Sequence, residues 1–279
     1  PASKNTVEIA AIRAVEAGTE VISPPAHAAF GTPLEMMEFI ARLRALSGGK
    51  PIGIKLCLGV RSEFLGVCRA MVESGIKPDF ITVDGGEGGT GAAPVEHTNS
   101  VGSPMRDGLA FVVDALIGFG LRDDIRINAS GKILTGFHVI RALALGAEIT
   151  SSARAMMLAL GCIMALECNK NSCPTGITTQ DPNLMAGLVP SSKAVRVARF
   201  QAETVKAVTE LLAAAGLHNT RQLQRRHIFR RSSETQVLCY DEIYPYPEPG
   251  CLLHGEPPKG MRTAFMESSA ESFHPATRL

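Results

Sequence analysis

Three closely spaced cysteines are the residues in this chain best suited to carry chemistry. Cys162, Cys168 and Cys173 fall within twelve residues, at a spacing of C-x5-C-x4-C, and a proline follows Cys173 directly. Thiolates gathered in this way usually bind a metal or an iron–sulfur cluster. A final Cys-Pro is typical of the cysteine motif of bacterial ferredoxins. With no fourth cysteine nearby, three thiolates suit a three-iron cluster better than a four-iron cluster or a closed zinc site. Buried structural cysteines are the alternative interpretation.

A lysine within an apolar segment is the second candidate. Lys55 lies in the stretch 51–56, which we expect to form a short strand buried on both faces. A buried ammonium needs a partner, because desolvation of an unpaired charge is costly. The pattern therefore favours a lysine that faces an anion or a cofactor, and an edge lysine that reaches water is the alternative.

A glycine-rich loop and two turns could form a ligand site. The loop at 84–91 can bring backbone amides close to a flat or anionic ligand, although it is neither a dinucleotide-binding fingerprint nor a P-loop. Each of the two turns places a small residue and a cation after a predicted strand, so together they could clamp one phosphate. A flexible linker and ordinary turns are the alternatives. The candidate residues are Asp84, Gly85, Gly86, Glu87, Gly88 and Gly89 in the loop, and Ser130, Gly131, Lys132, Ser152, Ala153 and Arg154 in the turns.

The periodicity of apolar residues predicts the elements that position these side chains. Strands are expected at 51–56, 80–83, 125–129 and 147–150, and helices at 34–46, 62–74, 104–118, 136–145 and 155–166. Strands that alternate with helices predict an α/β protein with a parallel sheet. Every special loop follows the carboxyl end of a strand, which is the active face of a barrel. The pattern therefore favours the C-terminal half of a (β/α)8 TIM barrel over a doubly wound sheet.

Beyond the cysteines the composition changes. A helix is expected at 192–215, and the basic stretch 219–231 is interpreted as a solvated helix face. From Tyr240 onward the chain is rich in Pro, Gly and Ser and lacks periodicity, which predicts loop or disorder, and we expect the last 25 residues to pack poorly. We therefore expect a partial barrel with an iron–sulfur loop over 1–190 and a helix with an irregular tail over 191–279. Since residue 1 is proline, we expect that further sequence precedes it.

The overall composition excludes several classes of function. The chain has 279 residues, a net charge of +1, and 20% charged residues without a basic stripe, so we expect no nucleic-acid partner. It contains no run of eighteen apolar residues and no visible signal peptide. The seven cysteines are not distributed as a secreted disulfide framework, which favours a reducing, cytoplasmic compartment.

Together these motifs resemble the FMN-binding glutamate synthase family, whose barrel domain carries FMN and an iron–sulfur cluster. The resemblance covers residues 1 to about 260. The motifs that carry it are GIKLCLG (53–59), DGGEGGTGAAP (84–94), NASGKILTG (128–136) and ALGCIMALECNKNSCPTGITTQDP (159–182). The last motif is the most specific, because it is similar to the three-cysteine signature of that family.

The resemblance implies two cofactors, FMN and a [3Fe-4S] cluster, with Cys162, Cys168 and Cys173 as cluster ligands. Lys55 matches the lysine that in this family lies near the flavin and the substrate carboxylate, so it is the catalytic candidate. The 84–91 loop matches the loop beside the flavin ring, while Gly131 and the 151–154 turn match phosphate-binding positions. Arg154 departs from the pattern, since the large enzymes usually have a small uncharged residue at this position.

The activity that the resemblance implies is that of an oxidoreductase acting on CH-NH2 donors. Reducing equivalents pass between the cluster and FMN, and reduced FMN delivers hydride to 2-iminoglutarate, formed from 2-oxoglutarate and ammonia, giving L-glutamate. The implied partners are an NAD(P)H-oxidising subunit or ferredoxin as electron donor, and a glutaminase partner or free ammonia as nitrogen source. A related FMN enzyme such as an N-methylglutamate synthase subunit, or a non-catalytic electron-transfer subunit, is the alternative. A half-barrel has two open sheet edges, so we expect this chain alone to hold FMN loosely and to be inactive if the other half is essential.

Overall fold

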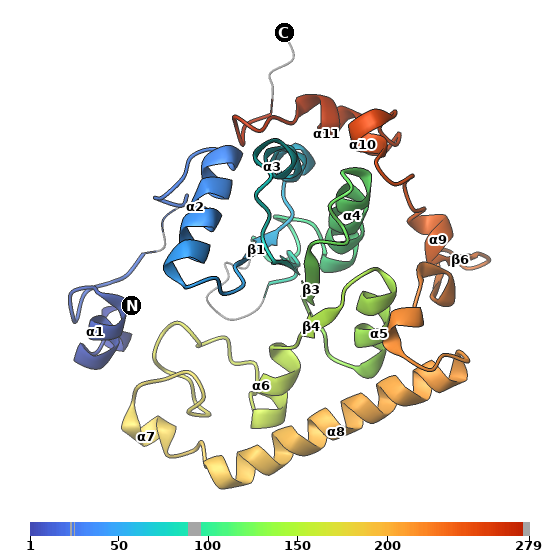
Figure 1. Cartoon of the computed structure of the whole chain (residues 1–279). Helices are drawn as coiled ribbons and strands as arrows, with labels where there is room; N and C mark the ends of the chain where they lie inside the picture. Colours follow the sequence, from blue (N-terminus) through green and yellow to red (C-terminus); the bar gives the residue numbers. More distant parts are fainter. Residues whose placement is uncertain (23, 25, 89–95, 276–279) are drawn as a thin grey trace.

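A four-stranded parallel sheet is the centre of the fold (Figure 1). The computed structural model describes residues 1–22, 24, 26–88 and 96–275. Strands β1 (Gly53–Cys57), β2 (Phe80–Asp84), β3 (Arg126–Ser130) and β4 (Ile149–Ser151) lie side by side in chain order. A doubly wound sheet reverses its strand order at a switch point, and these four strands show no reversal. The predicted α/β class with a parallel sheet is confirmed.

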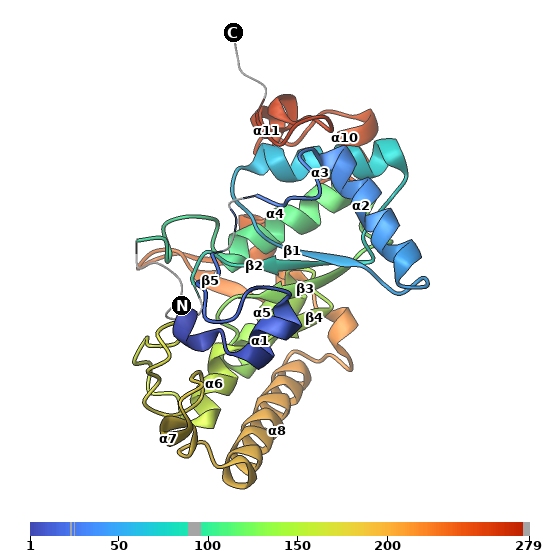
Figure 2. The same ribbon diagram turned by 90° about the vertical axis from the view of Figure 1, so that its left-hand side faces the viewer.

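Helices α2 (Pro33–Leu46), α3 (Arg61–Ser74) and α4 (Met105–Gly118) lie on the same side of the sheet (Figure 2). Thr32 and Glu35 form a capping box that starts α2, as the Thr-Pro sequence predicts. Gly75, with φ of 70°, ends α3 in the left-handed region that favours glycine. Apolar strand residues that face these helices are fully buried in the core: Ile81, Val83, Ile127 and Ala129.

The opposite face of the sheet is mostly polar and more exposed, although Thr82 in its centre is buried. Asn128 donates from Nδ2 to Thr82 Oγ1 at 3.2 Å and to Ser151 Oγ at 2.9 Å, which links three neighbouring strands. No residue of β1 is fully buried, so the prediction that this strand is buried on both faces is wrong. The reason is that α3 and α4 cover one face only, and no described element covers the other to the same extent.

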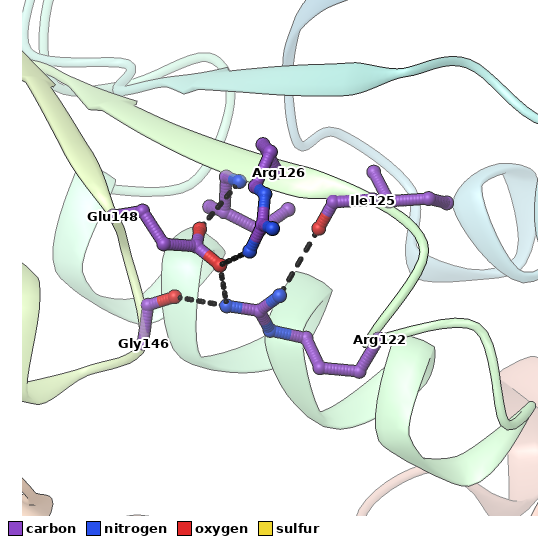
Figure 3. A network of polar contacts seen from close by, with 6 residues as sticks. Arg122, Ile125, Arg126, Gly146 and Glu148 are labelled. Carbon is purple, nitrogen blue, oxygen red and sulfur yellow. Dashed lines mark hydrogen bonds and ion pairs between the residues drawn. The ribbon is translucent and has the colours of Figure 1, made fainter. Parts of the chain in front are cut away.

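An arginine–acid clamp joins β3 and β4 at their amino ends (Figure 3). Arg122 donates to Glu148 Oε1 at 2.7 Å and to Gly146 O at 2.8 Å. The other carboxylate oxygen of Glu148 accepts the Ile127 amide at 2.7 Å. One carboxylate immediately before β4 therefore binds the backbone of β3 and an arginine that precedes β3. Arg126 makes a longer ion pair with Glu148, at 3.7 Å.

The same arrangement recurs at the amino ends of β1 and β2. Arg44, from α2, donates to Asp79 Oδ2 at 2.8 Å and to Lys77 O at 2.7 Å. Asp79 Oδ2 accepts the Ile52 amide at 2.7 Å. The hydrogen bonds from Arg44 and the Ile52 amide hold the pKa of Asp79 below its ordinary value of 3.8, although burial opposes them. In both clamps the arginine also binds the carbonyl two residues before the acid.

The chain leaves the sheet through a helix that is shorter than expected. Helix α6 covers Arg154–Leu160 and ends at Gly161, whose φ of 106° stops it before the first cysteine. The predicted extension to residue 166 is wrong, and the cysteines lie in irregular structure before α7 (Pro182–Met185). Helix α8 (Pro190–Ala214) then runs along α5 (Gly136–Ala144) and α6 (Figure 1).

The basic stretch after α8 is not a helix. It forms two 3-10 turns (Thr220–Gln222 and Arg225–His227) and β5 (Phe229–Arg231), which pairs with β6 (Val237–Cys239). Arg225 is fully buried and donates to Asp114 Oδ1 of α4 at 2.6 Å. The prediction of a solvated helix face is therefore wrong, because one arginine of the stretch anchors it to the core.

The tail from Tyr240 contains short helices that pack on the larger ones, contrary to the expectation of loop or disorder, and the described part of the last 25 residues includes buried Met261 and Ala270, contrary to the expectation of poor packing there. Its short helices are α9 (Tyr240–Ile243), α10 (Cys251–His254) and α11 (Arg262–Glu267), of which α10 contacts α4 and α11 contacts α3. Arg69 of α3 donates to the Phe265 carbonyl at 3.0 Å and stacks over its ring. A Cβ on Gly66 would lie 2.4 Å from the Ser269 carbonyl oxygen, so the tail backbone crosses α3 at a residue without a side chain.

At the other end of the chain, a 3-10 turn (Ala2–Lys4) and helix α1 (Val7–Arg13) lie beside the cysteine segment (Figure 2). None of the helices described is both long and apolar enough to cross a bilayer.

Candidate functional site

The loops that follow β2, β3 and β4 meet at the carboxyl end of the sheet. Gly131 has a φ of 139°, and a Cβ on it would lie 2.7 Å from Met105 Cβ and 3.2 Å from the Gly85 nitrogen. The turn after β3 therefore packs directly against the glycine-rich loop. Ser152, after β4, donates from Oγ to the Ile133 carbonyl at 2.8 Å. These contacts bring the predicted turns and the glycine loop together, although the contacting residues Gly85 and Gly131 are 46 residues apart in sequence.

The first part of the glycine loop has a fixed course. The Gly86 amide donates to the Ser103 carbonyl at 2.8 Å, and a Cβ on Gly86 would lie 2.7 Å from the Gly102 carbonyl oxygen. Glu87 accepts the Met105 amide on Oε1 at 2.9 Å, and so caps α4. Its other oxygen, Oε2, is buried and has no hydrogen-bond partner in the part of the chain that the structure describes. Asp84, Gly85 and Gly88 complete the described part of the loop, and Gly89 lies outside the described residues.

Lys55 is exposed, which contradicts the expectation of a buried lysine. Its side chain is 62% exposed, because it lies on the open face of the sheet. The ammonium does have an anionic partner, since Nζ is 2.7 Å from Asp84 Oδ2 on the neighbouring strand. Asp84 also accepts the Gly85 amide on Oδ1 at 3.0 Å, which ties the ion pair to the start of the glycine loop.

Two cations beside these loops have no acidic partner among the residues that the structure describes. Lys132 is exposed and has a positive φ of 50°, directly after Ser130 and Gly131. Arg154 is half-buried at the start of α6, after Ser152 and Ala153. Neither side chain pairs with a carboxylate among the residues described. Two unpaired cations on loops that meet are suited to a phosphate, so the residues fit the phosphate end of FMN.

The three cysteines line one small cavity beyond α6. Cys162, Cys168 and Cys173 are all half-buried there, and the cavity has a volume of about 20 Å³. In the described parts of the chain, no three His, Cys, Asp or Glu side chains are arranged to hold a metal ion. The donor set still fits an iron–sulfur cluster, because three thiols share a cavity and thiolates are the usual ligands of such clusters.

Cys173 is the cysteine best prepared to act as a ligand. Burial acts to raise the pKa of its thiol, but hydrogen bonds involving Thr175 and Thr178 outweigh it and lower the pKa to about 6. The Thr175 hydroxyl lies 3.4 Å from the sulfur. A thiol with this pKa is mostly thiolate at neutral pH, and the thiolate is the form that binds iron.

Sequence reasoning missed two residues that organise these regions. Asn128 lies within a recognised motif, but its hydrogen bonds to neighbouring strands appear only once the strand register is known. Lys4 donates to the carbonyls of Cys168 and Thr178, 164 and 174 residues away. No sequence signal identifies such a contact, because any residue can supply a backbone carbonyl.

Comparison with known proteins gives a consistent result. Residues 1–218 match a family model described as a conserved region in glutamate synthase. The chain is 40% identical to the glutamate synthase large subunit-like protein YerD of Bacillus subtilis, over 86% of this chain and 46% of that protein. It is 34% identical to the archaeal NADPH glutamate synthase of Methanocaldococcus jannaschii, over 80% of this chain and 43% of that protein. The chain thus spans about half the length of these relatives.

Among solved structures, a double variant of flavocytochrome b2 with sulfite bound is similar at a TM-score of 0.38 and 17% identity. That match covers 66% of this chain and 37% of the flavocytochrome chain. At this TM-score the likeness supports no conclusion about the present chain.

Proposed function

Because this chain belongs to the glutamate synthase family, we propose that it forms part of an oxidoreductase that makes L-glutamate from 2-oxoglutarate and ammonia through 2-iminoglutarate. The observation that carries the proposal is the meeting of three strand-end loops, with a three-cysteine cavity directly after the last of them. We further propose that the four strands and their alternating helices, within residues 1–190, are the C-terminal half of a (β/α)8 barrel. Residues 191–279 would be a C-terminal extension of this half-barrel.

The proposed cofactors are FMN and a [3Fe-4S] cluster. Gly85 to Gly89, Ser130 to Lys132 and Ser152 to Arg154 would hold FMN, and the three cysteines would hold the cluster. FMN supplies hydride chemistry when bound, and the cluster supplies one-electron transfer. The rest of the proposal concerns what the side chains of this chain do.

Lys55 is proposed to bind the negatively charged end of the substrate or of the flavin. Its ammonium is exposed on the open face of the sheet and is held by Asp84, so it is available to an incoming carboxylate. Because Asp84 also accepts the Gly85 amide, the lysine has a defined position relative to the glycine loop. A cation fixed in this way stabilises negative charge that develops during reduction without needing to reorganise.

Lys132 and Arg154 are proposed to neutralise the FMN phosphate. Both follow the carboxyl ends of adjacent strands, and the Ser152–Ile133 hydrogen bond holds their turns together. In barrel enzymes the phosphate site usually lies after the last two strands. The electron donor is proposed to be an NAD(P)H-oxidising subunit or ferredoxin, and ammonia is proposed to come from solution or from a glutaminase partner.

The direct test is to reconstitute this chain, together with the other half of the proposed barrel, with FMN, iron and sulfide and to follow oxidation of reduced methyl viologen. We expect oxidation that depends on 2-oxoglutarate and ammonia, with L-glutamate as product. Replacement of ammonia by methylamine distinguishes the alternative product N-methylglutamate. A protein that binds both cofactors but oxidises no donor with either amine would instead be an electron-transfer subunit.

A matched pair of cysteine variants tests the cluster. Cys168→Ser is expected to abolish the iron–sulfur absorbance, whereas Cys251→Ser, in α10 and outside the three-cysteine cavity, is expected to leave it unchanged. If Cys168→Ser retains the absorbance and full activity with the native donor, the proposed ligand set and relay are wrong.

A further inference from the structure

The start of the chain is attached to the segment that carries the cysteines. Lys4 donates from Nζ to the Cys168 carbonyl at 2.9 Å and to the Thr178 carbonyl at 2.8 Å. Asn171 donates from Nδ2 to the Ser3 carbonyl at 3.4 Å, which adds a second tie between the same two regions. Two residues near the amino terminus therefore hold a segment more than 160 residues away.

The two carbonyls that Lys4 binds lie on either side of Cys173. One belongs to the second cysteine itself, and the other lies five residues after the third. A single ammonium thus spans the turn that carries Cys173 and fixes the separation between its two ends.

The rest of the segment is closed by local hydrogen bonds. Thr179 donates from Oγ1 to the Asn171 carbonyl at 2.7 Å, and the Gln180 amide donates to Asn171 Oδ1 at 2.7 Å. These bonds shape the turn between Asn171 and Gln180 but do not attach it to the remainder of the molecule. The Lys4 and Ser3 contacts supply that attachment.

We propose that Lys4 is a positioning residue that closes the cysteine segment around its iron–sulfur cluster. The inference rests on the cluster of the proposed function. Hydrogen bonds and charges just outside the ligands fix ligand orientation, and their loss typically lowers metal affinity 10- to 100-fold. Because the Lys4 ammonium is 2.9 Å from the carbonyl of a proposed ligand, it would favour the more negative, reduced state of a bound cluster and so raise its midpoint potential.

The test compares Lys4→Met with Lys4→Arg and with a control, Lys259→Met. Methionine keeps the length of the side chain but removes the charge and the donors, whereas arginine keeps both. Lys259 is exposed and has no contact described with the cysteine segment. Each reconstituted variant is mixed with an iron chelator, and loss of the iron–sulfur absorbance is followed. FMN content and melting temperature report whether each variant is folded.

We expect Lys4→Met to lose its cluster about tenfold faster than the wild type and to have a more negative midpoint potential. Lys4→Arg is expected to stay within about twofold of the wild type, because a guanidinium can donate to both carbonyls. Lys259→Met is expected to match the wild type. If a folded Lys4→Met loses its cluster at the wild-type rate and with the wild-type potential, the proposal is overturned.

Hydrogen exchange gives a readout that does not depend on the cluster. In the cluster-free protein we expect Lys4→Met to speed amide exchange over residues 168–180 severalfold, with no change in Lys259→Met. If the wild type holds no cluster after reconstitution, the cluster part of the proposed function fails and exchange alone decides whether Lys4 closes the segment. Unchanged exchange in Lys4→Met would then rule out the closing role.

Discussion

The two ends of the parallel sheet use charged residues in opposite ways. At the amino ends, Arg44 with Asp79 and Arg122 with Glu148 satisfy each other and the strand backbone. At the carboxyl ends, Lys132 and Arg154 have no acidic partner among the residues described, and Glu87 keeps one buried oxygen without a hydrogen bond.

This difference indicates which charged residues stabilise the fold and which are available to bind a ligand. A charge that is already paired and hydrogen-bonded gains little from a ligand, whereas an unpaired cation or carboxylate oxygen is available to one. We therefore assign the amino ends a structural role and the carboxyl ends the proposed flavin site. Lys55 lies between these extremes, because it has a partner in Asp84 but remains 62% exposed.

The sharpest test of the comparison replaces Lys55, in the middle of β1, and Lys50, which precedes the amino end of the strand. Lys55→Met is expected to lower turnover about 100-fold or more, as removal of a preorganised charge-stabilising group typically does. Lys50→Met, an exposed lysine just before the strand, is expected to leave turnover unchanged. Steady-state rates with saturating 2-oxoglutarate and ammonia give the comparison. Equal losses in both variants would mean that the two ends do not differ in function.

At the amino end, removal of the Glu148 carboxylate should affect stability rather than activity. Glu148→Ala leaves the Ile127 amide without its carboxylate acceptor and removes the ion-pair partner of Arg122, so we expect a loss of about 2 kcal/mol in the free energy of unfolding. Arg126→Met is the matched control, because this arginine is 68% exposed and its ion pair is long. Urea unfolding measures both. An Arg126→Met loss as large as that of Glu148→Ala would contradict the clamp.

At the carboxyl end, Lys132→Met should weaken FMN binding without a change in stability. Loss of one charge-assisted contact to a phosphate is expected to raise the Kd for FMN about tenfold, or about 1.4 kcal/mol. Fluorescence titration of FMN measures the Kd, with Lys50→Met as the control. An unchanged Kd would remove Lys132 from the proposed phosphate site.

The smallest expected effect is the pH dependence of the Asp79 clamp. Arg44 and the Ile52 amide lower the pKa of Asp79 in the folded protein, so its contribution to stability is present above the ordinary value of 3.8. That contribution is lost as the pH falls through the lowered pKa. Asp79→Asn should therefore be less stable than the wild type at pH 6, by at most about 1 kcal/mol for this exposed pair, and the difference should disappear in acid. A difference that is independent of pH would show that the charge is not responsible.

Local patterns in the sequence were sufficient to predict the four strands of the parallel sheet and the helices that alternate with them. The Thr-Pro start of α2 and the Gly75 end of α3 are set by residues next to them in the chain. The glycine at 161 was a local signal too, but the apolar run that continues past it suggested a longer helix. The cysteines, the glycine loop and the two cation turns were all visible as motifs.

Features that depend on distant partners could not be predicted in this way. Arginine is usually a surface residue, and the burial of Arg225 depends on its ion pair with Asp114 in α4. The packed tail depends on Gly66, where the absence of a side chain lets the Ser269 carbonyl approach α3. Lys55 was expected to be buried because its neighbours in sequence are apolar, but the open face of the sheet determines its exposure.

The repeated clamp at the amino ends of the strands has a consequence for folding. Each clamp joins an arginine and an acid that are only 35 or 26 residues apart in sequence. The segment between them contains one strand and the helix that follows it. Contacts of such short sequence separation cost little loop-closure entropy and form early. Pairs of neighbouring units, β1 with β2 and β3 with β4, are therefore expected to be the first cooperative pieces of the nascent chain. The contact between β2 and β3 would join these two pieces afterwards.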